Sequence, residues 1–185
     1  MFYLTVIVLA WLISSLSVYF LGADGNFFGI LLRSFLGIAA VILWDGLWAF
    51  LIRRMPEKYF APMKKCFAVG EKELGFYRYL RIKKWKRFVP ELGGFTGFHK
   101  DKLADPRDPE YLSRYLLEAN YGVLIHFVNA LLGFAILFLP FLPLSLGIPI
   151  VIVNGILSLM PAMILRSNTP ALRRLLLRSS LHKQQ

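Results

Sequence analysis

The sequence has a single cysteine, Cys66, among its 185 residues. One cysteine excludes an internal disulfide and any metal site built from several cysteines. Familiar catalytic signatures are missing as well, since the chain has no GxGxxG, Walker loop, GxSxG or HExxH pattern. The three histidines are isolated along the chain, so their spacing does not indicate a metal site.

Charge is scarce, and negative charge is the scarcer kind. Charged residues make up 18% of the chain and hydrophobic residues 57%, with 22 Lys and Arg against 11 Asp and Glu. A soluble domain is about a quarter charged, so this composition favours a bilayer as the solvent. The positive residues border apolar segments, which favours anionic lipid headgroups and phosphate-bearing substrates as partners and argues against nucleic acid.

Long apolar runs are what the chain has in place of charge. They predict four membrane-spanning helices, at about residues 2–21, 27–52, 117–139 and 144–165. The first run lacks a charged leader and exceeds the hydrophobic length of a signal peptide, so we expect it to be a retained helix. Pro149 and Pro161 are expected to kink the fourth helix, which membrane helices tolerate.

The distribution of Lys and Arg predicts the orientation. Residues 53–116 contain 16 of the 22, and residues 166–185 contain five more. The positive-inside rule therefore places both termini and residues 53–116 in the cytosol. Residues 53–116 also interleave aromatic and basic side chains, a mixture that suits amphipathic helices in the headgroup region.

These patterns predict an all-α integral membrane bundle. We divide it into a transmembrane hairpin at residues 1–52, a basic interfacial segment at 53–116, a second hairpin at 117–165 and a basic tail at 166–185.

Polar side chains inside a span are costly, so each is a candidate functional residue. The third span contains Glu118, Asn120, His126 and Asn129. Glu118 and His126 share one helical face but lie about 12 Å apart along the axis, too far to form a pair. Two interpretations stay open: His126 is a general base with Glu118 orienting a substrate or a basic residue, or both side chains bond other helices. For Arg33 and Asp45 in the second span we expect mainly structural pairing.

The run from Arg81 to Glu91 is the most basic part of the chain, with five cations in its first seven positions. It suits either the diphosphate of a nucleotide such as coenzyme A or the headgroups under a surface helix. Composition alone favours the headgroups.

Three blocks of sequence carry a resemblance to a known family. They are Ile82-Lys83-Lys84-Trp85-Lys86 followed by Pro90-Glu91, then Glu118-Ala119 followed by Leu124-Ile125-His126-Phe127, and then Pro161 followed by Arg166-Ser167-Asn168-Thr169-Pro170-Ala171-Leu172. In this order the blocks resemble the glycosyl-4,4'-diaponeurosporenoate acyltransferases, small membrane enzymes of bacterial carotenoid biosynthesis. The resemblance spans residues 55–175.

The resemblance implies a multi-pass protein of the bacterial inner membrane that transfers a fatty acyl group to a sugar hydroxyl of a membrane-bound glycolipid. It implies catalytic roles for His126 and Glu118. It implies substrate-binding roles for Lys84, Trp85, Lys86, Glu91, Arg166 and Asn168. No bound cofactor or metal is expected, and the donor is an acyl-CoA or an acyl lipid.

Departures from the family pattern at Val123, Leu165, Ser167 and Thr169 leave the acceptor open, so another isoprenoid or lipid acceptor remains an alternative. A different class of function also stays open. The short chain, its basic and aromatic anchors and the missing catalytic signatures fit a non-catalytic small membrane subunit, or a lipid-binding scaffold with a membrane protein partner.

Overall fold

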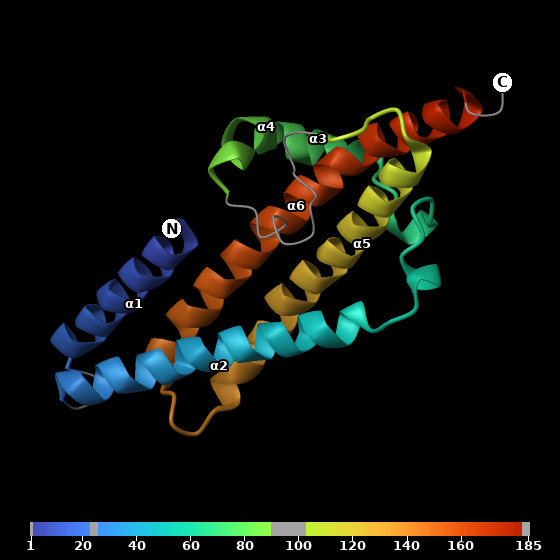
Figure 1. Ribbon diagram of the computed structural model, residues 1–185. Coiled ribbons are helices and arrows are strands. Elements are labelled where there is room, and N and C mark those ends of the chain that lie inside the picture. The colour runs from blue at the N-terminus through green and yellow to red at the C-terminus, as the bar shows by residue number, and fades with distance from the viewer. Residues whose placement is uncertain (1, 23–25, 90–102, 183–185) are drawn as a thin grey trace. The chain divides into compact units, whose positions relative to one another are not determined.

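A computed structural model describes residues 2–22, 26–89 and 103–182 of the chain (Figure 1). These residues form helices and contain no strand, which confirms the all-α prediction. In chain order the elements are α1 (Phe2–Phe20), α2 (Phe27–Arg53), η1 (Glu57–Tyr59), η2 (Lys65–Phe67), α3 (Glu71–Tyr79), α4 (Ile82–Trp85), η3 (Lys86–Phe88), α5 (Pro109–Leu132), η5 (Gly133–Phe138) and α6 (Leu144–His182).

Among the residues that the structure describes, three stretches are long and apolar enough to cross a membrane: α2, α5 continued by η5, and α6. Helix α1 is a shorter apolar helix of 19 residues. The predicted third span begins earlier than expected, at Pro109. Its start is set by Asp108, whose carboxylate accepts the backbone N–H groups of Glu110 and Tyr111, while the proline takes the first helical position.

Helix α6 is longer than the predicted fourth span. It continues through Pro161 and through most of the expected tail, and it ends at His182. The extension is held by packing, because Leu172 and Leu176 lie buried against α5. A segment that looks like a charged tail in sequence is therefore an amphipathic helix with a partner.

The chain divides into two compact units. Unit 1 comprises residues 1–51 and 125–159, and unit 2 comprises residues 52–124 and 160–185.

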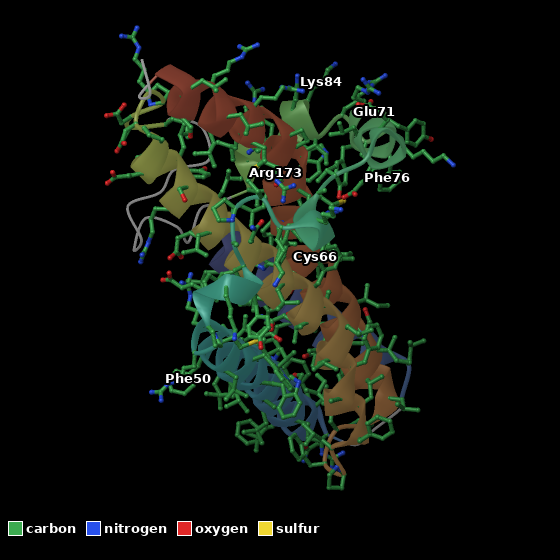
Figure 2. All side chains as sticks on the ribbon, turned by 90° about the vertical axis from the view of Figure 1, so that its right-hand side faces the viewer. Phe50, Cys66, Glu71, Phe76, Lys84 and Arg173 are labelled. Carbon is green, nitrogen blue, oxygen red and sulfur yellow. The ribbon has the colours of Figure 1, made fainter. Side chains whose placement is uncertain are left out.

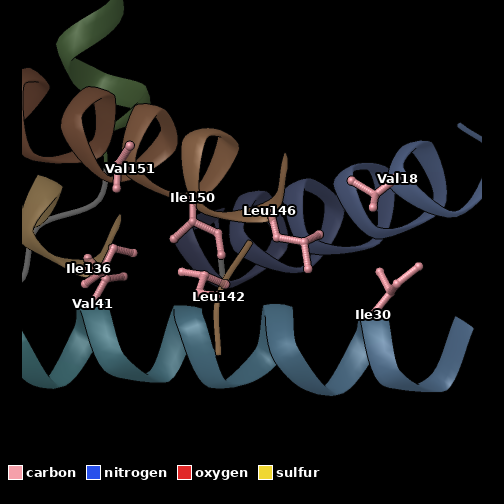
Figure 3. Packing of buried hydrophobic residues seen from close by; sticks show 8 residues of the cluster. All are labelled: Val18, Ile30, Val41, Ile136, Leu142, Leu146, Ile150 and Val151. Atoms are coloured by element: carbon pink, nitrogen blue, oxygen red, sulfur yellow. The ribbon is translucent and has the colours of Figure 1, made fainter. Parts of the chain in front are cut away.

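Unit 1 has an apolar core formed by α1, α2, η5 and α6 (Figure 3). Its buried members are Val18, Ile30, Val41, Ile136, Leu142, Leu146, Ile150 and Val151. The α1–α2 hairpin is also tied by hydroxyl groups, since the Ser34 hydroxyl accepts the Trp11 indole N–H at 2.8 Å and lies 2.9 Å from the Ser15 hydroxyl. Both kinds of contact suit a helix interface in a bilayer, where small polar residues join otherwise apolar helices.

Unit 2 has its own core, in which the first turns of α5 pack antiparallel to the end of α6 (Figure 1). Leu112, Tyr115 and Leu116 of α5 meet Leu172 and Leu176 of α6.

The described part of the basic segment is a series of short helices, as predicted. Helix α3 buries Tyr77 and exposes Phe76 and Tyr79. Arg81, with φ of 53°, turns the chain between α3 and α4. Short helices with aromatic rings and cations on their exposed sides are typical of segments that lie at a membrane surface.

Candidate polar site in unit 2

The strongest polar contact in unit 2 joins α6 to α3. The Arg166 guanidinium donates to both carboxylate oxygens of Glu73, with 2.7 Å between Nη2 and Oε2, and Nη2 also donates to the Ala68 carbonyl at 3.3 Å. The Tyr77 hydroxyl donates to the same carboxylate from one turn further along α3. The Arg166 side chain is 13% exposed, so this two-point ion pair is largely shielded from water.

The contact perturbs both partners on α3. The hydrogen bond from Arg166 holds the pKa of the Glu73 carboxyl below its usual value, against the opposing effect of burial. Burial, followed by the neighbouring Glu73 carboxylate, raises the pKa of Tyr77 to about 12. Glu73 is therefore an anion at neutral pH, and Tyr77 is a neutral donor.

Glu118 forms a second charged group. Its carboxylate accepts a hydrogen bond from Arg53 Nη1 at 2.9 Å and lies 3.8 Å from Arg114 Nε, and Arg114 in turn lies 3.7 Å from Glu57. The Glu118 side chain is 16% exposed. The Glu118 oxygens are thus shared between two guanidinium groups, one of them on α2, an arrangement that fits both interpretations of this residue.

Asn120 and Tyr121 attach the basic segment to α5. The Asn120 amide donates to the carbonyls of Phe60 and Ala61, at 2.9 and 3.3 Å. The Tyr121 hydroxyl donates to the Met55 carbonyl at 2.7 Å, and its ring stacks on Phe60 with 3.8 Å between centroids. These contacts fix residues 55–61 to the helix.

The Lys-Trp-Lys run lies on α4 and η3. The Trp85 indole N–H donates to the Leu80 carbonyl at 3.0 Å, which fixes the ring against the turn before it. Lys84 is exposed and Lys86 is half-buried. In Figure 2 the Lys84 side chain extends outward from α4. The run therefore places two lysines on either side of a tryptophan whose ring is fixed by a hydrogen bond to the preceding turn.

The remaining predicted residues are less connected. Asn168 on α6 is half-buried, and no polar partner is found for it among the described residues. Glu91 lies outside the described residues. His126 is half-buried on α5 and belongs to unit 1, and in the described part of the chain it too has no polar partner.

Arg173 is a functional candidate that the sequence analysis did not single out. It lies on α6 seven residues after Arg166, a spacing that puts both on one face of a helix. Its Nη2 donates to the Lys64 carbonyl at 2.7 Å, while its buried Nε has no acceptor among the described residues. The seven-residue spacing from Arg166 could have indicated Arg173 as a candidate, but only if residues 166–182 were already known to be helical.

A groove of roughly 780 Å³ lies in unit 2, between residues 57–62, the start of α5 and the end of α6. This size is within the range of small-molecule sites. None of the predicted site residues lines it, although Arg114, the partner of Glu118, does. Its charged lining is mixed, with Lys58 and Arg114 beside Glu57 and Glu110, so it does not favour anions by charge alone.

Unit 2 therefore contains six of the predicted site residues in described positions: Lys84, Trp85, Lys86, Glu118, Arg166 and Asn168. No group of three or more His, Cys, Asp or Glu side chains able to hold a metal ion occurs within residues 2–22, 26–89 and 103–182.

A sequence model of the glycosyl-4,4'-diaponeurosporenoate acyltransferases matches residues 56–178, which confirms the family that the three sequence blocks indicated. No curated protein and no solved structure matches the chain.

Proposed function

This chain belongs to the glycosyl-4,4'-diaponeurosporenoate acyltransferase family, and we propose that it moves a fatty acyl group onto a hydroxyl of a membrane glycolipid or glycosylated isoprenoid. The observation that carries the proposal is the extent of the match, because residues 56–178 include all eight predicted site residues. The long apolar helices make it a membrane protein, and the Lys and Arg distribution supports a reaction at the inner leaflet with both termini in the cytosol.

The reaction joins an acyl donor and an alcohol. A base removes the proton of the acceptor hydroxyl, and the oxygen attacks the donor carbonyl carbon. The resulting oxyanion collapses, the bond to the donor's sulfur or oxygen breaks, and the leaving group takes up the proton. A protein speeds this sequence by placing a base at the hydroxyl and donors at the developing oxyanion.

We assign the base to His126. Its ring has no polar partner among the described residues, so it is available to accept a proton. Glu118 is less suited to this step, because its carboxylate is already held by Arg53 and Arg114. We propose that Glu118 positions these guanidinium groups.

The donor-binding role belongs to the Lys-Trp-Lys run. Lys84 and Lys86 supply positive charge, and Trp85 is fixed by its bond to Leu80. These side chains suit the phosphates of an acyl-CoA and equally the phosphate of an acyl lipid. We propose that Arg166 and Asn168 stabilise the oxyanion, Arg166 by exchanging one of its hydrogen bonds to Glu73 for one to the substrate, and that no bound cofactor or metal takes part.

The test is a lipid analysis of cells that lack the protein, carry it, or carry His126→Ala. We expect an acylated glycolipid that is present with the intact protein and is reduced at least a hundredfold in His126→Ala, in keeping with the loss of a general base. Leu131→Ala is the matched control, since Leu131 is 71% exposed on the same helix. Immunodetection in the membrane fraction shows whether each variant inserts.

Equal lipid profiles in all strains would contradict the proposal. If the protein also co-purified with one membrane protein, the non-catalytic subunit would become the better description. An acylated lipid without a sugar would keep the reaction and change the acceptor.

A further inference from the structure

The groove of unit 2 has no role in the steps described for the transfer reaction. It lies between residues 57–62, the first turns of α5 and the end of α6, and these two helix ends pack against each other (Figure 1). Every described residue that lines the groove belongs to unit 2, so its shape is set within one compact unit. Its volume of roughly 780 Å³ is sufficient for a sugar ring or a lipid headgroup.

The groove has an apolar floor and a charged rim. Leu117 of α5 and Leu176 of α6 line it with only 7% and 9% of their surfaces exposed, so they form its deepest part. The Glu57 and Arg114 side chains, by contrast, are 67% and 59% exposed. A ligand that fits this lining has an apolar face toward the two leucines and polar groups around its edge.

The charges at the rim are balanced in sign. Among the described lining residues, Lys58 and Arg114 are positive, and Glu57 and Glu110 are negative. An anion would be attracted by the two cations and repelled by the two carboxylates, and a cation would meet the opposite balance, so net charge favours neither. A neutral ligand with several hydroxyls avoids this conflict, because a hydroxyl can donate to a carboxylate and accept from an ammonium or a guanidinium.

Glu57 and Arg114 are spaced to bind such hydroxyls together. Glu57 Oε1 lies 3.7 Å from Arg114 Nη1, a separation longer than a hydrogen bond. Two neighbouring hydroxyls of a sugar ring can bridge these atoms, one donating to the carboxylate and the other accepting from the guanidinium. Because both protein groups are charged, the two hydrogen bonds belong to the stronger kind.

A hexose fits the floor as well as the rim. One face of a pyranose ring consists of C–H groups, which can pack on Leu117 and Leu176, while its hydroxyls project from the edge. A zwitterionic headgroup such as phosphoethanolamine also carries both charges. Its charged ends are strongly hydrated, however, and it offers little apolar surface to the two leucines.

The groove also lies close in sequence to the end of a long apolar helix. Glu57 follows Arg53, the last residue of α2, by four residues, so the backbone at Glu57 lies within about 14 Å of that helix end. A sugar carried by a membrane lipid is therefore a source within reach of the rim.

We propose that the groove of unit 2 binds the neutral hexose headgroup of a glycolipid, with the ring on Leu117 and Leu176 and neighbouring hydroxyls between Glu57 and Arg114. The lipid as the source of the sugar rests on the proposed function, which takes a glycolipid as acceptor. The preference for a neutral polyhydroxyl ring does not, because it follows from the lining of the groove.

The test is saturation-transfer NMR on the full-length protein in phosphatidylcholine nanodiscs, which contain no sugar. Three soluble probes are titrated: methyl β-D-glucopyranoside, glycerol 3-phosphate as an anion and glycerophosphoethanolamine as a zwitterion. We expect the glucoside to bind with a Kd of about 1 mM, and each charged probe to bind roughly fivefold more weakly or less. Equal or tighter binding of either charged probe overturns the proposal.

Two variants change the groove itself. Glu57→Ala removes the exposed acceptor, and we expect the Kd for the glucoside to rise about tenfold. Ser113→Phe places a ring in the groove and should abolish binding. Glu71→Ala is the matched control, because it removes the same charge from an exposed position on α3 that does not line the groove. An unchanged Kd in Glu57→Ala overturns the proposal, and this exposed substitution decides the test if Ser113→Phe fails to fold.

Nanodiscs that contain a glucosyl diacylglycerol separate a lipid-borne sugar from a free one. We expect this glycolipid to compete with the glucoside and to raise its apparent Kd roughly fivefold or more. Absence of competition overturns the assignment to a lipid headgroup. The assay contains no acyl donor, so glucoside binding by a protein that acylates no lipid would refute the proposed function and leave the groove standing. Acyl transfer without glucoside binding would do the reverse.

Discussion

Unit 1 and unit 2 hold their helices together by different means. In unit 1 the contacts are apolar, with short hydroxyl bonds such as those of Ser34 and a few unpaired polar atoms. In unit 2 charged and amide side chains reach across the sequence to carboxylates and main-chain carbonyls. The same chain therefore uses two kinds of interface.

The difference follows from the solvent that each kind of residue meets. Within a bilayer an unpaired charge is expensive and apolar contact with lipid is free of penalty, so helices join through small and apolar residues. By the positive-inside rule we expect residues 53–89 to lie near the membrane surface. With access to water there, ion pairs can form with part of their hydration retained. Four substitutions or conditions test this contrast.

The largest effect is expected for Glu73→Ala in unit 2. The change leaves the Arg166 guanidinium without its carboxylate, and we expect a loss of roughly 2–3 kcal/mol of stability. Thermal unfolding in detergent, followed by far-UV circular dichroism, measures it. Glu71→Ala is the matched control, since Glu71 is exposed in the first turn of the same helix (Figure 2). An equal effect from both variants would mean that the ion pair does not hold α3.

The next effect is expected for Asn120→Ala. The side chain is 1% exposed, and its loss leaves the Phe60 and Ala61 carbonyls without a donor, at a cost of about 2 kcal/mol. Trypsin should then cleave faster after Lys64 and Lys65. Ser167→Ala serves as control, because that hydroxyl bonds only its own helix. Unchanged cleavage would show that stacking on Tyr121 suffices to hold the segment.

In unit 1 the corresponding test is steric. A Cβ atom at Gly37 would lie 2.9 Å from Leu142 and 3.0 Å from Ile150, so Gly37→Ala should destabilise the core by about 1–2 kcal/mol. Gly46 on the same helix has no atom within 4 Å of such a Cβ, and Gly46→Ala should be neutral or stabilising by up to about 1 kcal/mol. Equal melting temperatures for the two variants would argue against close packing at Gly37.

The smallest effect is expected from pH, and it should act on unit 2. The pKa of Glu73 is lowered, so its contribution is complete above the ordinary value of 4.5 and is lost as the pH falls through the lower folded value. The pKa of Tyr77 is raised to about 12, so stability should fall between pH 10 and 12, where the unfolded phenol ionises first. In melting curves recorded across pH, Glu73→Gln should lack the loss of stability at low pH. Tyr77→Phe should lack the loss of stability between pH 10 and 12.

The sequence predicted those features of the fold that depend only on the local run of residues. Apolar runs predicted helices because a membrane helix must satisfy its backbone hydrogen bonds within itself. It was less successful at element boundaries. Pro109 with its Asp108 cap begins α5, and the tail that looked separate is the end of α6, because Leu172 and Leu176 pack on α5.

Some residues of the polar contacts were already candidates from the sequence. Glu118 was one because it is polar in a predicted span, and Arg166 was one through the family resemblance, whereas Glu73, Arg173 and Asn154 were not singled out. Glu73 looks like any surface acid of a basic segment, and only the approach of α6 gives it a role. The partners of Glu118 and Arg166 lie 65 and 93 residues away in sequence, and no local pattern specifies such a pairing.

The sequence by itself determined that this is an all-helical membrane protein of an acyltransferase family, because hydropathy and the order of its motifs are local properties of the chain. The tertiary structure alone decided which polar groups are paired and which are left unpaired. Pairing depends on helices that approach each other across long stretches of sequence, as Arg166 meets Glu73 and as Asn154 fills the space at Gly133. That approach is set by packing, which no single segment contains.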